Sequence, residues 1–418
     1  MSSPATPRPP EGYRLVDVPP ERRADITAIN TWGFPSSTTP AQRETLTWPL
    51  DFARTRGVES DGELVAFHAS YEFADHPVPG ARIPVSGLTW VSVHPAHRRR
   101  GLLSAMIDDH FARSLARGEA VSALWASEMS IYGRFGYGLA ARSVALSIPR
   151  GAALRDVPGS DGVRVRLEVL DAEAHLALFQ ELHAAVERPG WTRRSTVGLE
   201  ASALQDPEFW REGYEAMRIA VAERDGVPVA FARFRRKLAW ASTGPDGTVQ
   251  VLDYVSRDAA ATRALWGVLL DLDLMARVEI EALPLDDPLL ALLVDWPAAK
   301  PVLAENLWVR VLDLPVALAS RRYAAPVDVV LEVTDTRLPA NAGRWRLVGG
   351  PDGARVERTE APAQLAIDVR ELGTLFLGGF SLAQLVGAGL VRELEPGATF
   401  AASAAFGWPL APVASWIW

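Results

Sequence analysis

Residues 90–104, Trp-Val-Ser-Val-His-Pro-Ala-His-Arg-Arg-Arg-Gly-Leu-Leu-Ser, constrain the fold of this chain most strongly. The segment predicts a strand, a basic loop and a glycine that opens a helix. The first turn of a helix presents free backbone N–H groups and the positive end of the helix dipole, so it binds anions. Glycine lets the main chain approach a phosphate closely, and the arginines add fixed positive charge. We therefore expect a cradle for cofactor phosphates rather than a solvated basic turn.

Length and composition limit the classes of protein to consider. A chain of 418 residues predicts two or three domains, and 48% hydrophobic with 22% charged residues is typical of folded proteins. Apolar runs of about 18 residues are absent, as is the apolar core of a secretory signal, so we expect a cytoplasmic protein without a membrane partner. The absence of cysteine excludes disulfides and an acyl-cysteine intermediate. A net charge of −8 argues against nucleic acid as a partner.

The first domain is predicted at residues 13–155, after a disordered lead-in at residues 1–12. The helix after Gly101 has an apolar face with helical spacing, formed by Leu103, Met106, Ile107, Phe111 and Leu115. Asp108, Asp109 and Arg113 are expected on its polar face, and Gly118 fits its end. The next strand, at residues 120–126, is expected to run parallel to residues 90–93 because the helix makes a crossover.

A second domain is predicted at residues 156–300, because the order of elements repeats there. A hairpin at residues 216–235 precedes a strand at 249–255 and a helix at 259–274. At the cradle position the sequence is Ser256-Arg257-Asp258-Ala259, with an acid and no glycine. We infer a second copy of the fold that has lost cofactor binding. The basic run at residues 233–237 is interpreted as a strand with one buried and one solvated face rather than a nucleic-acid site.

The third domain is predicted at residues 301–418. A strand at residues 363–370 leads to a glycine loop, and Ser381 is expected to cap a helix at 382–388. The chain ends in an apolar segment that contains Trp408, Trp416 and Trp418. Chain ends are normally polar and frayed, so this tail is expected to dock on the protein.

The cradle, together with the motif Tyr132-Gly133-Arg134-Phe135-Gly136-Tyr137, resembles the GCN5-related N-acetyltransferases (GNATs). The sequence Arg98-Arg99-Arg100-Gly101-Leu102-Leu103 resembles the enhanced intracellular survival (Eis) branch of that family in particular. The resemblance covers nearly the whole chain. It implies a mixed α+β and α/β protein with two tandem GNAT-like folds, the first active and the second degenerate, and a sterol-carrier-like C-terminal domain. It also implies acetyl-CoA as co-substrate, no metal, and a homohexamer.

The resemblance assigns the cofactor contacts to three segments. Backbone N–H groups of the cradle would hold the pyrophosphate, from Arg100, Gly101, Leu102, Leu103 and Ser104. The side chains of Arg98 and Arg99 would reach the adenosine phosphates. The main chain of Val91, Ser92 and Val93 would pair with the pantetheine arm, and an N–H near Val91 or Val93 would polarise the thioester carbonyl. Ser127 and Glu128 would flank the cofactor through main-chain contacts.

Two groups are predicted to move protons. Tyr132, a phenol with an ordinary pKa of about 10, would be protonated at neutral pH and donate to the leaving thiolate. The alternative is a structural tyrosine with a satisfied hydroxyl, as we expect for Tyr137. In the Eis branch the C-terminal carboxylate acts as the base, which here is Trp418. The alternative is a tail that only packs.

The acceptor site is predicted near Trp32 and Phe34, with Trp48 and Asp51 close by in the sequence. Aromatic faces and acids suit polycations, although an ordinary aromatic core explains each residue equally well. Eis-type sites can carry an acid beside the last residue, and this chain has Ile417 there. We expect N-acetylation of a cationic small molecule, aminoglycoside- or polyamine-like, or of lysine. The alternatives are a non-catalytic acetyl-CoA or lipid-binding scaffold or sensor, and an acetyltransferase for protein lysines or N-termini.

Overall fold

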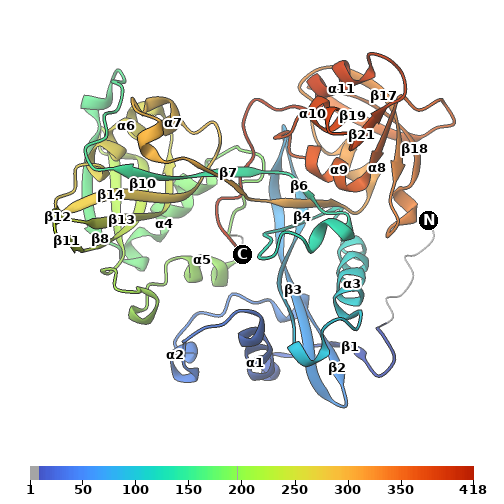
Figure 1. The fold of residues 1–418 in the computed structure, drawn as a ribbon, viewed down its shortest axis with the longest axis horizontal. Coiled ribbons are helices and arrows are strands. Elements are labelled where there is room, and N and C mark those ends of the chain that lie inside the picture. Colours follow the sequence, from blue (N-terminus) through green and yellow to red (C-terminus); the bar gives the residue numbers. More distant parts are fainter. Residues whose placement is uncertain (1–8, 195) are drawn as a thin grey trace. The chain divides into compact units, whose positions relative to one another are not determined.

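A computed structural model describes residues 9–194 and 196–418 of the chain (Figure 1). These residues form two compact units, each described separately below. The first unit combines the chain up to Ala141 with Arg188–Gly198 and Asn306–Trp418, and the second combines Arg142–Glu187 with Leu199–Glu305. Residues 1–8 of the predicted lead-in lie outside the described residues. Within the described ranges, no helix is long and apolar enough to cross a membrane.

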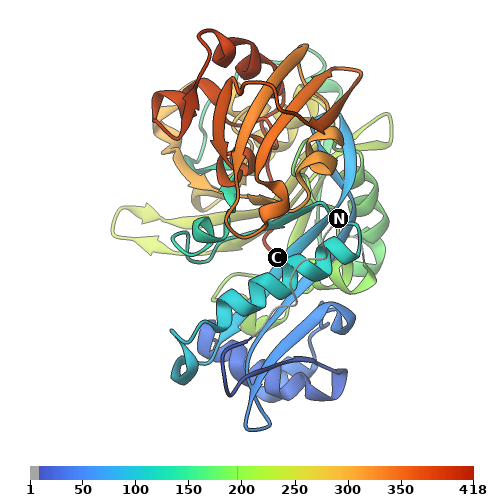
Figure 2. The same ribbon diagram turned by 90° about the vertical axis from the view of Figure 1, so that its right-hand side faces the viewer.

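The first unit contains a mixed sheet with the strand order β1-β2-β3-β4-β5-β16-β6. Its strands are β1 (Arg14–Asp17), β2 (Thr55–Ser60), β3 (Glu63–Val78), β4 (Ala81–Val93), β5 (Val121–Leu124), β16 (Trp308–Val311) and β6 (Gly138–Leu139). Helices α1 (Arg23–Gly33) and α3 (Leu102–Ala116) both pack against β3 and β4, and α2 is the short helix Pro40–Glu44. Figure 2 shows α3 in cyan crossing the blue strands of this sheet. The predicted crossover helix is therefore present.

Strands β4 and β5 are parallel, but their pairing differs from the prediction. The paired residues are Val85–Gly87 of β4 and 121–123 of β5, so residues 88–93 continue beyond the pairing. The physical reason is a β-bulge in β4, where Trp90 and Val91 together lie opposite His68 of β3. Trp90 has a φ of 54°, which is rare outside glycine. A bulge bends and twists its strand, and residues 90–93 consequently do not pair with β5.

Helix α3 buries most of the residues that were expected on its apolar face. Met106, Ile107 and Phe111 are buried, and Gly118 adopts a φ of 78° just after the helix ends. The prediction for Asp109 was wrong, because its side chain is buried rather than on the polar face of the helix. Its carboxylate accepts a hydrogen bond from Arg56 at 3.3 Å, and this ion pair explains how the charge is accommodated in the interior.

The second unit is built around a sheet with the strand order β15-β7-β14-β13-β10-β9-β8. Its strands are β15 (Val302–Glu305), β7 (Arg142–Pro149), β14 (Met275–Leu283), β13 (Gly247–Ser256), β10 (Val227–Lys237), β9 (Arg218–Arg224) and β8 (Arg164–Val169), with a small hairpin of β11 (Trp240–Ala241) and β12 (Gly244–Pro245). Its helices are α4 (Ala172–Ala184), α6 (Ala259–Leu269) and α7 (Pro288–Leu292), and α5 (Val197–Ala203) spans the boundary of the two units. The parallel pair β13 and β14, joined through α6, repeats the order β4-α3-β5. Helix α6 ends earlier than predicted, because residues 271–274 form a turn in which Leu274 has a φ of 64°.

The sheets do not follow the boundaries predicted at residues 155 and 301. Strand β7 pairs with β14 and β15 in the second sheet, although residues 142–149 were expected in the first domain. Strand β16 pairs with β5 and β6 in the first sheet, although residues 308–311 were expected in the third domain. Each of the first two sheets therefore includes a strand from a distant part of the sequence.

The C-terminal part of the first unit contains a separate sheet with the strand order β19-β18-β17-β20-β21. Its strands are β19 (Gly353–Arg358), β18 (Gly343–Gly350), β17 (Val327–Thr334), β20 (Leu365–Asp368) and β21 (Val391–Glu393), and its helices are α8 (Leu314–Ala319), α9 (Val369–Leu375), α10 (Leu382–Gly387) and α11 (Ala398–Phe406). Helix α9 approaches β16 so closely that a Cβ atom on Gly373 would lie 2.3 Å from the Val309 carbonyl oxygen. Ser381 occupies the N-cap position of α10 without a side-chain cap, since its hydroxyl lies 3.1 Å from that of Ser403.

Candidate active site

The predicted phosphate cradle joins β4 to α3 through the short 3-10 turn Pro95–His97. Gly101 is the N-cap of α3 with a φ of 81°, and no side chain caps the helix. The N–H groups of the first turn are therefore not occupied by a neighbouring side chain. Arg98, Arg99 and Arg100 are exposed, and Arg99 has a φ of 60°. This geometry fits an anion at the start of α3.

The three arginines of the cradle differ in their partners. Arg100 donates a hydrogen bond from Nη1 to the Tyr13 hydroxyl at 2.7 Å, and the same hydroxyl lies 3.0 Å from Nδ1 of His97. Among the described residues, the guanidinium groups of Arg98 and Arg99 have no ion-pair partner. Partial burial and the charge of Arg100 lower the pKa of His97, which favours the neutral imidazole. The fixed positive charge of the loop therefore lies mainly on the arginines.

In the second unit, an acidic side chain of the protein caps the helix equivalent to α3. Asp258 is the N-cap of α6, and its Oδ1 accepts a hydrogen bond from the Ala261 N–H at 2.9 Å. Arg224 donates to both carboxylate oxygens of Asp258, at 2.8 and 3.0 Å, and lowers the pKa of that carboxyl. A carboxylate thus occupies the helix N-terminus where α3 leaves it open. This arrangement supports the inference that the second copy has lost phosphate binding.

Three of the predicted site segments meet at one hydrophobic cluster. Val91 of β4, Leu103 of α3 and Tyr132 all pack against it. The buried members of the cluster are Leu88, Ile107, Phe111, Leu124, Phe135, Tyr137, Trp308 and Leu312. Residues far apart in the sequence are therefore brought together where β4 and β5 stop pairing.

Ser92 contributes to this region differently from its neighbours. Its side chain is buried and donates a hydrogen bond to the Ile29 carbonyl of α1 at 3.3 Å. Val93 packs with Val91 on the side of the sheet that faces α3. The Ser92 side chain is therefore engaged with α1, and the predicted cofactor contact of Ser92 would use its main chain.

Tyr132 begins the 3-10 turn Tyr132–Phe135, and its ring lies edge-on to that of Tyr137 at 5.8 Å between centroids. Among the described residues, its hydroxyl has no hydrogen-bond partner. Burial, assisted by the negative charge of Glu128, raises the pKa of Tyr132 to about 12. The phenol is therefore protonated at neutral pH with its proton uncommitted.

Tyr137 matches the structural alternative. It is fully buried, and its hydroxyl lies 2.8 Å from that of Ser122, which in turn lies 2.8 Å from Nε2 of His110. The two tyrosines of the motif thus differ in hydrogen bonding. Ser127 and Glu128 lie in the exposed loop between β5 and Tyr132.

The aromatic tail docks on β3 of the first unit. The Trp418 ring lies edge-on to Phe73 at 5.0 Å and 5.6 Å from Trp416. The Trp416 ring lies 6.3 Å from Tyr71. Ile417 points outward with 66% of its surface exposed. The expectation that the tail packs on the protein is therefore met within the first unit.

Polar contacts also hold the tail in place. The Ala414 N–H donates to Oδ1 of Asn306 at 2.6 Å, and Nδ2 of Asn306 donates back to the Ala414 carbonyl at 3.4 Å. The Thr192 carbonyl accepts hydrogen bonds from the Ser415 hydroxyl at 2.9 Å and the Trp416 indole at 2.8 Å. Thr192, which the sequence analysis did not associate with the site, thus holds the end of the tail in place.

Tyr71 connects the tail to the bulge in β4. Its hydroxyl accepts a hydrogen bond from the Trp90 indole at 3.0 Å, and burial raises the pKa of Tyr71 to about 12. The Trp90 ring lies 5.3 Å from Trp48, and the guanidinium of Arg23 lies 4.4 Å above Trp48. The sequence analysis missed Tyr71, although aromatic residues at positions 71 and 73 of one strand share a face.

The predicted acceptor residues do not form one cluster. Trp32 and Phe34 are exposed, by 59% and 43%, and the Trp32 ring lies 5.4 Å from His94. Trp48 instead contacts Trp90. The Asp51 carboxylate caps the 3-10 turn Phe52–Arg54 by accepting the Ala53 N–H at 2.9 Å. Across the part of the chain that the structure describes, no three acidic or histidine side chains are grouped to hold a metal ion.

Comparison with protein families gives three matches along the chain. Residues 19–140 and residues 190–311 each match a model described as an acetyltransferase (GNAT) domain. Residues 314–415 match a sterol carrier protein domain. The two copies of the acetyltransferase fold and the sterol-carrier-like end are therefore confirmed.

Whole-chain relatives agree with these matches. The chain is 42% identical over 368 residues to an uncharacterized N-acetyltransferase of Streptomyces coelicolor, covering 86% of this chain and 88% of that protein. It is 35% identical over 337 residues to the N-acetyltransferase Eis of Mycobacterium tuberculosis, covering 76% and 77%. The crystal structure of Eis1 from Mycobacterium abscessus superposes with a TM-score of 0.80 at 30% identity, covering 97% of this chain and 100% of that one.

Proposed function

Because the chain belongs to the Eis family of GCN5-related N-acetyltransferases, we propose that its first GNAT domain acetylates an amine with Tyr132 as acid and the Trp418 carboxylate as base. Family membership makes the chain an N-acetyltransferase and implies acetyl-CoA as the acetyl donor. One observation carries the assignment to the first domain. Val91, Leu103 and Tyr132 pack on one cluster beside an uncapped helix N-terminus, whereas Asp258 caps the equivalent helix of the second domain.

Acetyl-CoA supplies an acetyl group activated as a thioester. The main-chain N–H groups of residues 100–104 would hold its pyrophosphate, with Arg98 and Arg99 contributing charge. The main chain of residues 91–93 would pair with the pantetheine arm, because this part of β4 is not paired with β5. Ser127 and Glu128 would border the cofactor through their main chain. We assign polarisation of the thioester carbonyl to the N–H of Val91, since the bulge removes Val91 from regular pairing with β3.

Tyr132 would protonate the departing sulfur. A phenol with a pKa of about 12 holds its proton throughout the neutral range, and no neighbouring acceptor among the described residues competes for it. Tyr137 would not take this role, because its hydroxyl is engaged with Ser122. Of the two tyrosines in the motif, Tyr132 is therefore the one assigned to protonate the departing sulfur.

The carboxylate of Trp418 would accept the proton that the attacking amine loses, directly or through water. An α-carboxyl group has an ordinary pKa of about 3.5, so it is ionised at neutral pH. Ring contacts with Phe73 and the hydrogen bonds of residues 414–416 restrain the end of the chain. Such restraint is needed for a base at a terminus, which is otherwise mobile.

The proposed acceptor is the amine of a cationic small molecule, aminoglycoside- or polyamine-like, or of lysine. The exposed rings of Trp32 and Phe34 supply faces suited to cations. The test is CoA release, detected with a thiol reagent, from acetyl-CoA and a panel of polyamines, aminoglycosides and lysine peptides. Because the chain has no cysteine, the protein adds no background. Amine-dependent release supports the proposal, whereas acetyl-CoA binding without release supports the scaffold or sensor alternative.

We also propose that the chain assembles as a homohexamer, as the resemblance implies. Light scattering coupled to size-exclusion chromatography tests this assembly. A mass of six chains supports it, and a stable monomer contradicts it.

A further inference from the structure

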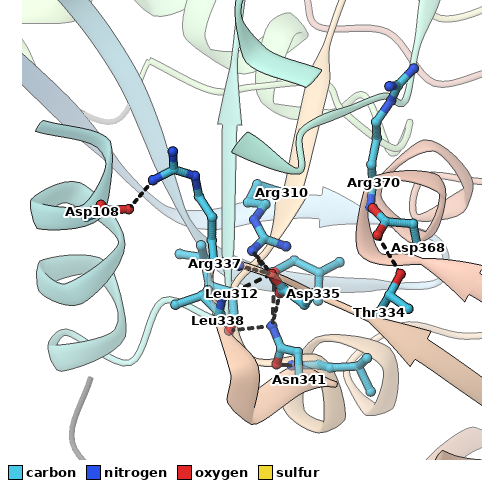
Figure 3. Close-up of polar contacts among 12 residues, drawn as sticks. Asp108, Arg310, Leu312, Thr334, Asp335, Arg337, Leu338, Asn341, Asp368 and Arg370 are labelled. Atoms are coloured by element: carbon cyan, nitrogen blue, oxygen red, sulfur yellow. Dashed lines mark hydrogen bonds and ion pairs between the residues drawn. The ribbon is translucent and has the colours of Figure 1, made fainter. Parts of the chain in front are cut away.

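A loop of the sterol-carrier-like domain, residues 335–341 between β17 and β18, is anchored in the interior of the first unit (Figure 3). Arg310 of β16 is 0% exposed and donates from Nη2 to both carboxylate oxygens of Asp335 at 2.8 Å. Asp335 also accepts the N–H groups of Arg337 and Leu338 at 3.1 and 3.0 Å, and Nδ2 of Asn341 at 3.0 Å. A buried carboxylate with this many donors fixes the shape of the loop.

The same loop presents Arg337 to the helix of the phosphate cradle. Nη1 of Arg337 donates to Oδ1 of Asp108 at 2.6 Å, and Nη2 lies 3.5 Å from the hydroxyl of Ser104 in the first turn of α3. The guanidinium also lies 4.5 Å from the centroid of the Phe135 ring. Figure 3 shows Arg337 reaching from the loop toward Asp108 on α3. Arg337 therefore contacts both α3 and the turn that carries Tyr132.

Leu338, the residue after Arg337 in the loop, adds an apolar contact. It packs against the hydrophobic cluster to which Val91, Leu103 and Tyr132 also belong. The loop thus packs against the same cluster as Val91, Leu103 and Tyr132. A solvent-exposed ion pair alone contributes only about 0–1 kcal/mol to stability, but here one guanidinium combines an ion pair with stacking on a ring between two elements.

We propose that Arg337 is a positioning residue for acetyl-CoA, contributed by the sterol-carrier-like domain. It holds the first turn of α3 in a fixed position relative to the Tyr132 turn, because its guanidinium contacts both. This inference rests on the proposed function of the first domain. It gives the C-terminal domain a role in cofactor binding in addition to supplying the tail.

The test compares Arg337→Ala with Arg346→Ala. Arg346 is a matched control, because it pairs with Asp328 in the same domain through an exposed ion pair without contacting α3. The Kd of acetyl-CoA is measured by calorimetry without acceptor, together with KM, kcat and the thermal midpoint. In Arg337→Ala we expect Kd and KM for acetyl-CoA to rise about fivefold to tenfold, the size of effect expected for losing one hydrogen bond that positions the site, with kcat nearly unchanged. The control should match the wild type.

A charge exchange tests whether Arg337 acts on acetyl-CoA binding through its ion pair with Asp108. Asp108→Arg should weaken acetyl-CoA binding, and the double variant Asp108→Arg/Arg337→Asp should recover much of it. An Arg337→Ala protein that binds acetyl-CoA as tightly as Arg346→Ala overturns the inference, as does a loss confined to kcat and thermal midpoint. If wild-type protein turns over but Arg337→Ala is normal, only this inference fails. If wild-type protein does not bind acetyl-CoA, the proposed function fails with it.

Discussion

The phenol of Tyr132 is the side chain on which the proposed proton transfer depends most. Tyr132→Phe keeps the ring in its cluster and removes the acid, so kcat should fall by about 100-fold or more, in the range of general acid catalysis. The KM for acetyl-CoA should stay near the wild-type value, because no hydrogen bond of the fold is lost. Steady-state kinetics with an active amine measure both constants.

Tyr137→Phe is the matched control for that variant. It removes the buried hydrogen bond with Ser122, so we expect a loss of about 1 kcal/mol in stability and a much smaller change in kcat. A Tyr132→Phe enzyme with unchanged turnover would remove Tyr132 from the role of acid. Reversed effects in the two variants would assign that role to Tyr137.

Buried histidines make stability depend on pH in the first unit. Burial, with a smaller contribution from Arg82, lowers the pKa of His76 to about 3, and the pKa values of His68 and His110 are also lowered by burial. The unfolded chain binds these protons near pH 6.5, whereas the folded chain binds them only at lower pH. Stability is therefore full above about pH 6.5 and falls on acidification, for His76 by up to about 1.4 kcal/mol per pH unit, and His68 and His110 add to the loss in the same direction.

Unfolding transitions measured from pH 8 to pH 5 check this expectation. His76→Gln should flatten the dependence by the share of one histidine, because glutamine takes up no proton. A wild-type curve that is level between pH 6.5 and pH 5 would contradict the assignment of neutral buried imidazoles.

At the scale of elements, the sequence predicted those whose signals are local. The basic loop, Gly101 and the apolar spacing that follows them predicted α3, and the glycine at residue 226 predicted the hairpin of β9 and β10. The exchange of β7 and β16 between sheets was not predicted, because strand pairing depends on distant partners that no local pattern specifies. Asp109 was misplaced for a similar reason, since its partner Arg56 lies on strand β2, far away in the sequence.

The candidate site was predictable to a similar extent. The cradle, Tyr132 and the docking of the tail follow from motif and composition, whereas Tyr71 and Arg337 act through contacts between segments far apart in the chain. The contacts of Arg188 and Thr192 with the tail have no sequence signal, because the acceptor in each is a backbone carbonyl oxygen.

The close packing of α9 on β16 provides a test at the element scale. Gly373→Ala would place a methyl group 2.3 Å from the Val309 carbonyl oxygen, so the two elements must separate. We expect a loss of about 1–3 kcal/mol in the free energy of unfolding, the usual range for overpacking. Chemical denaturation of the full chain measures this change.

Gly387→Ala is the control, because the added methyl group has no neighbour within 4 Å and Gly387 lies in a helix. Its effect should be neutral or stabilising by up to about 1 kcal/mol. Equal effects of the two substitutions would contradict the described approach of α9 to β16.

For the whole molecule, the two copies of the GNAT fold predict unequal cofactor binding. Calorimetry should give one acetyl-CoA per chain, because α3 is open at its N-terminus and Asp258 caps α6. Gly101→Glu should abolish binding, since it adds a negative charge and a side chain at a φ of 81°. Two molecules per chain, or normal binding by Gly101→Glu, would contradict the assignment of the two copies.

The most direct test of an active site completed by the chain's own end is to convert the Trp418 carboxylate into an amide by protein ligation. The amide keeps every ring contact of the tail and removes only the charge. We predict that CoA release with an active amine falls by about 100-fold or more, in the range expected for loss of a general base, while the Kd of acetyl-CoA is unchanged. Equal rates for the acid and the amide would show that the C-terminal carboxylate is not the base.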